Sequence, residues 1–198
     1  MRDMTTDSAH PHPDARTRIV AVAREMFAES SFAAVSLKEI ARVAEVSPAL
    51  IVKHFHTKEN LFAATLDFSE SARALFAGPF ERLGATAIEE TLTAPWAAPY
   101  SIVRALTVAD GSQASVQAIG ERIQSDILRV LTSRIAQEAP HPYPAPRLRA
   151  QAAMSLLTGL SMMRRCGDVE FSSFPREQLV AFYATELQSL IDGHPQPR

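Results

Sequence analysis

The chain has 198 residues, of which 46% are hydrophobic and 21% charged, and its formal net charge is -2. This length suffices for a small domain and a larger one, each with its own core. The one cysteine, Cys166, excludes an internal disulfide framework and is typical of a reducing cytoplasm. The longest uncharged run, 150–163, is too short to span a bilayer, so we expect a cytoplasmic protein without a membrane segment.

Hydrophobic residues recur with helical spacing along the chain, whereas the alternation typical of strands is absent. We therefore expect an all-α fold of about nine helices, with a three-helix domain at 15–62 and a larger helical domain at 63–192. Residues 1–14 are polar and lack the apolar core of a signal peptide, so they predict a disordered tail, and 193–198 form a second tail. Glycine and proline clusters separate the expected helices, at about 16–30, 36–44, 47–54, 57–76, 80–92, 98–109, 113–137, 147–165 and 176–191.

Three helix starts lie close together between positions 36 and 61. Ser36 and Glu39 match the Ser-x-x-Glu pattern of a capping box, in which each side chain accepts a hydrogen bond from the other residue's amide. Ser47 is an N-cap candidate followed by Pro48 at the first helical position, and Thr57 caps the next helix. Two short helices joined by a tight turn form a helix-turn-helix, whose second helix, here about 47–54, enters the major groove of DNA.

The spacing of residues around these helices resembles the DNA-binding domain of the tetracycline-repressor (TetR) family of bacterial regulators. The residues that carry the resemblance are Ile40-Ala41, Ala44-x-Val46-Ser47, His54-Phe55 and Lys58-x-x-Leu61. They cover roughly the first third of the chain. The resemblance implies a DNA-binding domain of three helices and a helical domain for ligand binding and dimerisation. It further implies a repressor that a small molecule releases from a palindromic operator.

The chain departs from the family pattern in the turn and in the second helix. Glu45 stands where the family usually has glycine, and a positive φ there would cost a non-glycine residue about 1 kcal/mol. Ala49 also stands where glycine is common. Val52 replaces an aromatic residue, often tyrosine, whose hydroxyl contacts a phosphate in many members. Valine cannot make that hydrogen bond, but it can contact a thymine methyl or fill space.

Net charge alone does not indicate a nucleic-acid partner, because residues 14–61 hold seven basic and six acidic side chains. The placement of the bases favours DNA, since several surround the expected recognition helix; a solvated charged face is the alternative. We expect double-stranded DNA as a partner, with contacts from Ser36, Lys38, Ser47, Pro48, Ala49, Val52, Lys53, His54, Thr57 and Lys58.

Aromatic, methionine and aliphatic residues recur in the middle helices of the larger domain. If these helices enclose a cavity, its lining favours an apolar or aromatic ligand with few polar contacts. Ordinary core packing is the alternative for each residue, and the ligand hypothesis depends mainly on the resemblance. The candidates are Phe76, Phe80, Trp96, Tyr100, Val103, Leu106, Ile119, Ile123, Met162 and Met163.

The last two expected helices carry wide apolar stripes, and Ser155 and Gly159 are small residues four positions apart. The resemblance assigns these helices to an interface between two copies, which would place two recognition helices about 34 Å apart on a palindrome. An intramolecular bundle core is the alternative. The candidate interface residues are Met154, Ser155, Leu157, Gly159, Leu179, Phe182, Tyr183 and Leu187.

The sequence shows no histidine pair with metal-ligand spacing and no nucleotide-binding glycine loop, so we expect neither an enzyme nor a metal or other cofactor. Two other functions stay open. One is a DNA-binding regulator without a small-molecule ligand, which a fully packed larger domain would favour. The other is a helical ligand-binding or catalytic bundle with a vestigial helix-turn-helix. The operator, the ligand, the regulated genes and the sign of regulation are not determined by the sequence.

Overall fold

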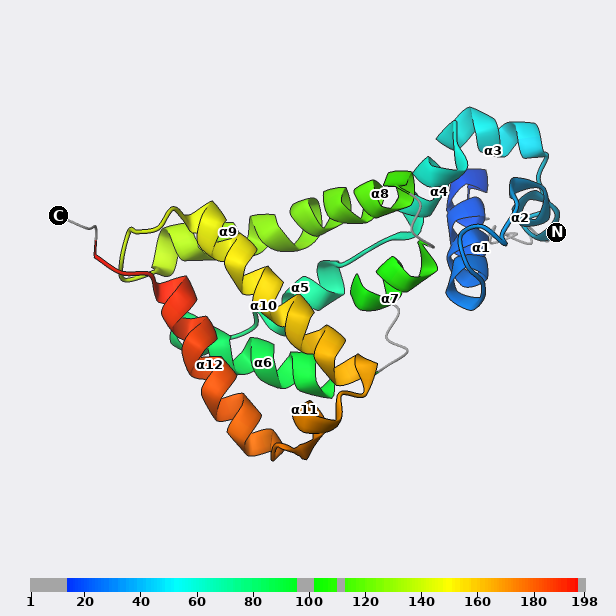
Figure 1. Cartoon of the computed structure of the whole chain (residues 1–198). Helices are drawn as coiled ribbons and strands as arrows, with labels where there is room; N and C mark the ends of the chain where they lie inside the picture. Colours follow the sequence, from blue (N-terminus) through cyan, green and yellow to red (C-terminus); the bar gives the residue numbers. More distant parts are fainter. Residues whose placement is uncertain (1–13, 96–101, 110–112, 196–198) are drawn as a thin grey trace, which may run out of the picture. The chain divides into compact units, whose positions relative to one another are not determined.

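The structure, a computed structural model, describes residues 14–95, 102–109 and 113–195 (Figure 1). Over these residues it is helical, and the only strand-like pairing is an isolated bridge between Tyr143 and His194, which confirms the predicted all-α class. The chain divides into two compact units, which we call the head (up to Thr65) and the body (from Leu66). No helix within the described ranges is both long and apolar enough to cross a membrane.

The head consists of four helices, α1 (Ala15–Glu29), α2 (Leu37–Val43), α3 (Pro48–Phe55) and α4 (Lys58–Thr65). Its centre is an aromatic cluster in which the Phe62 ring lies edge-on to the rings of Phe27 and Phe32, with centroids 5.1 and 5.4 Å away. Such pairs add to the burial of their apolar area. The cluster joins α1 and α4 around the loop before α2, and so supports the two helices that follow.

The body contains the remaining elements, and α6 packs against both α10 and α12 (Figure 1). The helix predicted at 113–137 is present as three consecutive elements, α8, the π-helical turn η2 and α9. A short helix, α11, was not predicted. The elements are α5 (Ser69–Leu75), η1 (Phe80–Arg82), α6 (Leu83–Thr93), α7 (Ile102–Val108), α8 (Gln113–Ile123), η2 (Gln124–Leu128), α9 (Arg129–Glu138), α10 (Pro146–Cys166), α11 (Val169–Ser173) and α12 (Arg176–Asp192).

The single helix predicted at 57–76 is wrong, because the chain leaves the helix after Thr65 and starts again at Ser69. Asp67 Oδ1 accepts a hydrogen bond from the Ser69 amide at 2.9 Å, a local bond that competes with helix formation. Asp126 Oδ2, from the π-helical turn, accepts one from the Phe68 amide at 3.1 Å. Side-chain carboxylates thus take amide donors that a continuous helix would have used.

Two body helices approach each other closely at Gly84 on α6. Its amide donates to Gln188 Oε1 of α12 at 2.8 Å, and a Cβ there would collide with the Ala184 carbonyl oxygen. The sequence places Gly159 in an interface between two copies, and outside its own helix no atom lies within 4 Å of the place where a Gly159 Cβ would be. A tight contact inside the chain is thus the one between α6 and α12, and the role of Gly159 stays a prediction.

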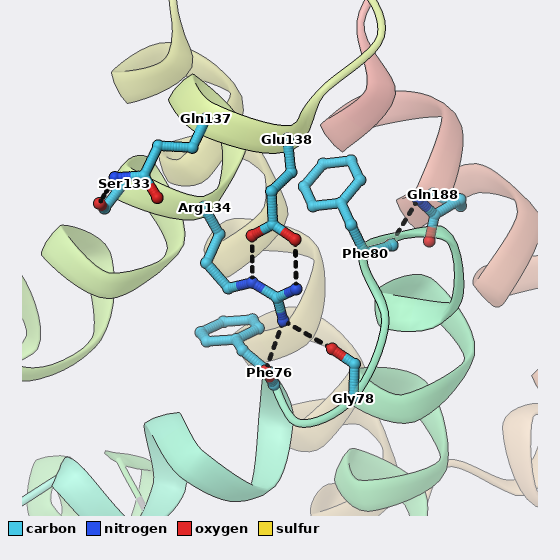
Figure 2. A network of polar contacts seen from close by, with 8 residues as sticks. All are labelled: Phe76, Gly78, Phe80, Ser133, Arg134, Gln137, Glu138 and Gln188. Atoms are coloured by element: carbon cyan, nitrogen blue, oxygen red, sulfur yellow. Dashed lines mark hydrogen bonds and ion pairs between the residues drawn. The ribbon is translucent and has the colours of Figure 1, made fainter.

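Arg134 of α9 connects three segments of the body (Figure 2). Its guanidinium forms a two-bond pair with Glu138, at 2.7 and 2.8 Å, and donates to the carbonyls of Phe76 at 2.8 Å and Gly78 at 3.0 Å. The pair with Arg134 lowers the pKa of Glu138. The Phe80 ring centroid lies 6.0 Å from the same guanidinium. Phe76 and Phe80, both buried, thus form the turn that Arg134 fixes.

Two further arginines bind the carbonyl ends of helices. Arg149, only 3% exposed, donates to the Ile191 carbonyl at the end of α12, at 2.9 Å. Arg164 donates to the carbonyls of Leu92 and Ala94 at the end of α6, at 2.9 and 2.7 Å. The last carbonyls of a helix lack intrahelical donors and carry partial negative charge, which a guanidinium complements. Burial lowers the pKa of both arginines.

Candidate functional site

The turn between α2 and α3 has the geometry expected of a helix-turn-helix. Glu45 adopts a φ of 54°, so the predicted positive φ at this non-glycine position is confirmed. The Val46 amide donates to the Ala41 carbonyl at 3.0 Å and closes the turn. Ser47 then begins α3, with Pro48 in its first turn. These local contacts determine how α3 leaves α2.

Helix α3 has a buried face and an exposed face. Ile51 is fully buried and Phe55 is 4% exposed, so these two side chains attach the helix to the rest of the head. Val52, one position along from Ile51, is 47% exposed. The other exposed residues of the helix are Pro48, Ala49, Lys53 and His54.

Three hydroxyl side chains predicted to contact DNA cap the N-terminal ends of α2, α3 and α4. Ser36 Oγ accepts from the Glu39 amide at 3.2 Å, and the Ser36 amide donates to Glu39 Oε2 at 3.1 Å, which completes the predicted capping box. Ser36 Oγ also donates to Glu39 Oε2 at 2.7 Å, and the bonds from Ser36 lower the pKa of Glu39. Ser47 Oγ accepts from the Leu50 amide at 3.2 Å, and Thr57 Oγ1 from the Asn60 amide at 3.1 Å. The Ser36 proton is used inside the box, whereas the Ser47 and Thr57 hydroxyls donate to no described residue.

The lysines of the head differ in their surroundings. Lys38 and Lys53 are exposed. The Lys58 ammonium lies 4.3 Å from the centroid of the Phe32 ring, a cation–π contact, and its partial burial lowers its pKa. Lys58 therefore has a structural contact of its own, and its predicted role at a phosphate stays a prediction.

The body contains a cavity of about 80 Å³ between α5, α6, α7 and α10, which we call the inner cavity. Thr91 on α6 is 7% exposed and lines this cavity. A threonine hydroxyl can both donate and accept a hydrogen bond, so Thr91 offers a polar contact there. The cavity is lined by Ser71, Leu75, Glu90, Thr91, Ala94, Ile102, Val103, Met154, Leu157, Thr158, Ser161 and Arg165.

Comparison with known families covers both units. Residues 19–65 match the family described as "Bacterial regulatory proteins, tetR family", and residues 81–191 match "Tetracyclin repressor-like, C-terminal domain". The second match alone spans more than half of the chain. The chain belongs to the TetR family.

Curated relatives in this family match part of the chain. The chain is 39% identical over 82 residues to the HTH-type transcriptional regulator UidR of Escherichia coli strain K12, a match covering 41% of this chain and 40% of that protein. It is 38% identical over 56 residues to the regulator QacR of Staphylococcus aureus strain Mu50, covering 28% of this chain and 30% of QacR. Matches to these two relatives therefore span less than half of their length.

Solved TetR-fold structures cover nearly the whole chain. The reduced form of Escherichia coli NemR superposes with a TM-score of 0.60 at 18% identity, over 88% of this chain and 97% of NemR. Salmonella enterica GusR gives a TM-score of 0.58 at 18% identity, over 92% and 99% of the two chains. At these identities the likeness shows the fold alone.

Most ligand-binding residues predicted for this TetR-family chain lie away from the inner cavity. Val103 is the one described member of the predicted set that lines it. Met162 lines a neighbouring groove of about 490 Å³, which shares Val103 and Arg165 with the cavity. Trp96 and Tyr100 are outside the described residues. The others are buried elsewhere or point to the surface: Phe76, Phe80, Leu106, Ile119, Ile123 and Met163.

Most of the predicted ligand-binding residues lie away from the cavity because its position depends on how four helices cross. Its described lining contains hydroxyls and two charged side chains and no aromatic ring, and the predicted ligand-binding residues stay a prediction. Thr91 and Thr158 are ordinary helix residues in the sequence, and no local pattern distinguishes them. Only their position against the other helices marks them.

The predicted interface residues of α10 and α12 fall into two groups. Met154, Leu157 and Leu187 are in the interior of the chain, 6%, 3% and 2% exposed, so they have almost no surface left for a second copy. Helical periodicity shows that a face is apolar, but it does not show which neighbour covers it. Phe182 is 60% exposed. Ser155 and Gly159 are exposed as well, whereas Leu179 and Tyr183 are half-buried.

Proposed function

We propose that this TetR-family chain is a homodimeric transcriptional repressor, which leaves a palindromic operator when a small molecule binds the inner cavity. The observation that carries this proposal is α3, a capped helix that is anchored by its buried face and exposes the other. A helix presented in this way fits the major groove, which admits an α-helix.

Exposed bases next to α3 supply the contacts to phosphate in this proposal. Each lysine that neutralises a phosphate releases counterions, so its removal lowers the salt dependence of binding by about one unit of slope, or about two in a dimer. Lys53→Ala should show this decrease in fluorescence anisotropy titrations on the DNA upstream of the chain's own gene. Arg73→Ala, an exposed body residue, is the control. An unchanged slope for Lys53→Ala would remove Lys53 from the interface, and no binding by the wild type would contradict the DNA-binding function itself.

The dimer in this proposal uses the exposed part of the α10 and α12 surface. Phe182 of α12 is an exposed apolar side chain, and Ser155 and Gly159 of α10 are exposed, with nothing outside its own helix within 4 Å of a Gly159 Cβ. Apolar area of this kind is typical of subunit interfaces. Sedimentation should show a dimer at micromolar concentration, and Phe182→Glu should shift it to monomer. Val116→Glu, an exposed valine on α8, is the control. A wild-type monomer would exclude this model.

The effector in this proposal is compact and has one polar group. The inner cavity offers apolar contacts from Leu75, Ile102 and Leu157, while Thr91 offers a hydroxyl. Pockets for drug-sized ligands measure roughly 300–1,000 Å³, so about 80 Å³ admits a small molecule or requires the neighbouring groove as well. The ligand would favour conformations in which the two recognition helices no longer match the spacing of about 34 Å.

Thr91 allows a matched test of the effector site. Phenol and benzene differ by one hydroxyl, so methyl NMR should show tighter binding of phenol to the wild type, and Thr91→Val should remove that preference. Thr93→Val is the control, because the Thr93 hydroxyl already donates to the Glu89 carbonyl at 2.7 Å and faces solvent. Equal binding of phenol and benzene by the wild type would contradict the role of Thr91. Binding of neither probe would favour a DNA-binding regulator without a small-molecule ligand.

A further inference from the structure

The exposed face of α3 is mainly apolar, which is unusual for a surface that must distinguish bases. Pro48, Ala49 and Val52 lie at positions i, i+1 and i+4, so they are neighbours on one side of the helix. Lys53 borders this group. The surface that α3 would bring to DNA thus has an apolar centre and a basic edge.

The polar chemistry available on α3 is limited. Bidentate recognition of guanine or adenine in the major groove uses arginine, lysine, asparagine or glutamine. The eight residues of α3 include no arginine, asparagine or glutamine, and Lys53 is the only one of these four types present. Most of the base discrimination by this helix must therefore come from contacts that are not paired hydrogen bonds.

Val52 is the side chain best placed to supply such a contact. It is 47% exposed, whereas its neighbour Ile51 is fully buried, so Val52 has little part in the core of the head. Ile51 and Phe55 hold the helix in place, and valine has few side-chain rotamers in a helix. The two methyl groups of Val52 are therefore presented in a nearly fixed direction.

We propose that Val52 is a specificity-determining residue that packs against the 5-methyl group of a pyrimidine in each operator half-site. This group is the apolar feature that base edges present in the major groove, and thymine and 5-methylcytosine both carry it. The inference rests on the proposed DNA-binding function and adds the chemistry of one contact. Burying one methyl group changes affinity about fourfold, so two half-sites together give about 15-fold.

The test starts from duplexes that full-length protein selects from a random 20-base-pair library. At each thymine of the selected site, uracil replaces thymine, which removes only the methyl group. We expect one position per half-site at which uracil weakens wild-type binding about fourfold, and at which Val52→Ala binds thymine and uracil equally. At the same position, 5-methylcytosine should bind more tightly than cytosine if the methyl group alone is recognised.

Val43→Ala is the matched control, because Val43 is also a valine of the head, on α2, and is 46% exposed. It should keep the full thymine preference, and circular dichroism should show both variants folded. If Val52→Ala discriminates thymine from uracil as strongly as the wild type does, the contact is excluded. If no thymine in the selected site is sensitive to uracil, it is excluded as well. If the library yields no bound duplex, the DNA-binding function fails instead.

Discussion

The head and the body are both helical, but three helix starts of the head are fixed by local hydrogen bonds, whereas two helix ends of the body are fixed by residues far away in the chain. In the head, Ser36, Ser47 and Thr57 each accept a hydrogen bond from an amide three residues later. In the body, Arg149 reaches a carbonyl 42 residues away and Arg164 one that is 72 residues away. The difference shows why a helix-turn-helix can be recognised in a short window, whereas a ligand cavity cannot. Local hydrogen bonds can be predicted from neighbouring residues, whereas long-range hydrogen bonds depend on how distant helices pack.

The largest effect should come from the long-range contact at Gly84. Gly84→Ala would force α6 away from the Ala184 carbonyl, and we expect a loss of about 3 kcal/mol in the free energy of unfolding. Urea unfolding followed by circular dichroism measures this change. Gly120→Ala is the control, since its Cβ would meet nothing within 4 Å, and it should stabilise α8 by about 1 kcal/mol. If Gly84→Ala and Gly120→Ala change the free energy of unfolding equally, close packing at Gly84 does not determine the contact between α6 and α12.

The buried Arg149 should give the next largest effect. Arg149→Met removes a charged donor from the Ile191 carbonyl and should lower the free energy of unfolding by about 2 kcal/mol. Hydrogen exchange should increase at the end of α12 and stay unchanged in α1 to α3. Arg147→Met, an exposed position on the same helix, should leave both regions unchanged. If Arg149→Met also increased amide exchange throughout the head, the head and the body would not be separate units of stability.

Loss of a local cap should affect the head by a smaller amount. Ser47→Ala removes the acceptor for the Leu50 amide and should cost about 1 kcal/mol, because that amide loses its side-chain partner. Hydrogen exchange should increase in α3 but not in α10 or α12. Ser69→Ala is a control at the start of α5, where no side-chain cap is present. Equal exchange in α3 for Ser47→Ala and the wild type would show that the cap adds nothing to the stability of this helix.

The capping box should make the smallest contribution and one that depends on pH. Hydrogen bonds from Ser36 lower the pKa of Glu39 below its ordinary value of 4.5. A carboxylate with a lowered pKa in the folded state stabilises the fold above its unfolded pKa, and this contribution is lost as the pH falls through the folded value. Glu39→Gln should therefore destabilise α2 at pH 7, and this effect should become smaller as the pH falls below 4.5. Glu25→Gln, on the exposed side of α1, is the control.

The sequence predicted the helix-turn-helix to within a residue or two because its caps and turn depend on adjacent residues. It missed the break after Thr65, because one of the two carboxylates involved, Asp126, lies 58 residues from its partner Phe68. It predicted that α10 and α12 carry apolar faces, yet it could not show that Leu157 and Leu187 face the interior. Periodicity identifies an apolar face, and tertiary contacts decide what covers it.

By itself, the sequence determined the all-α class, the three helix starts between positions 36 and 58, and the resemblance to TetR regulators. Those features follow from capping, turn conformation and helical period, which act within about one turn of helix. Only the tertiary structure decided that Gly84 is a site of close packing between α6 and α12. It also decided that Phe76 and Phe80 form a turn around Arg134, and that Thr91 faces a cavity. A cavity is the space left between helices that are distant in the chain, so it exists only once they have packed.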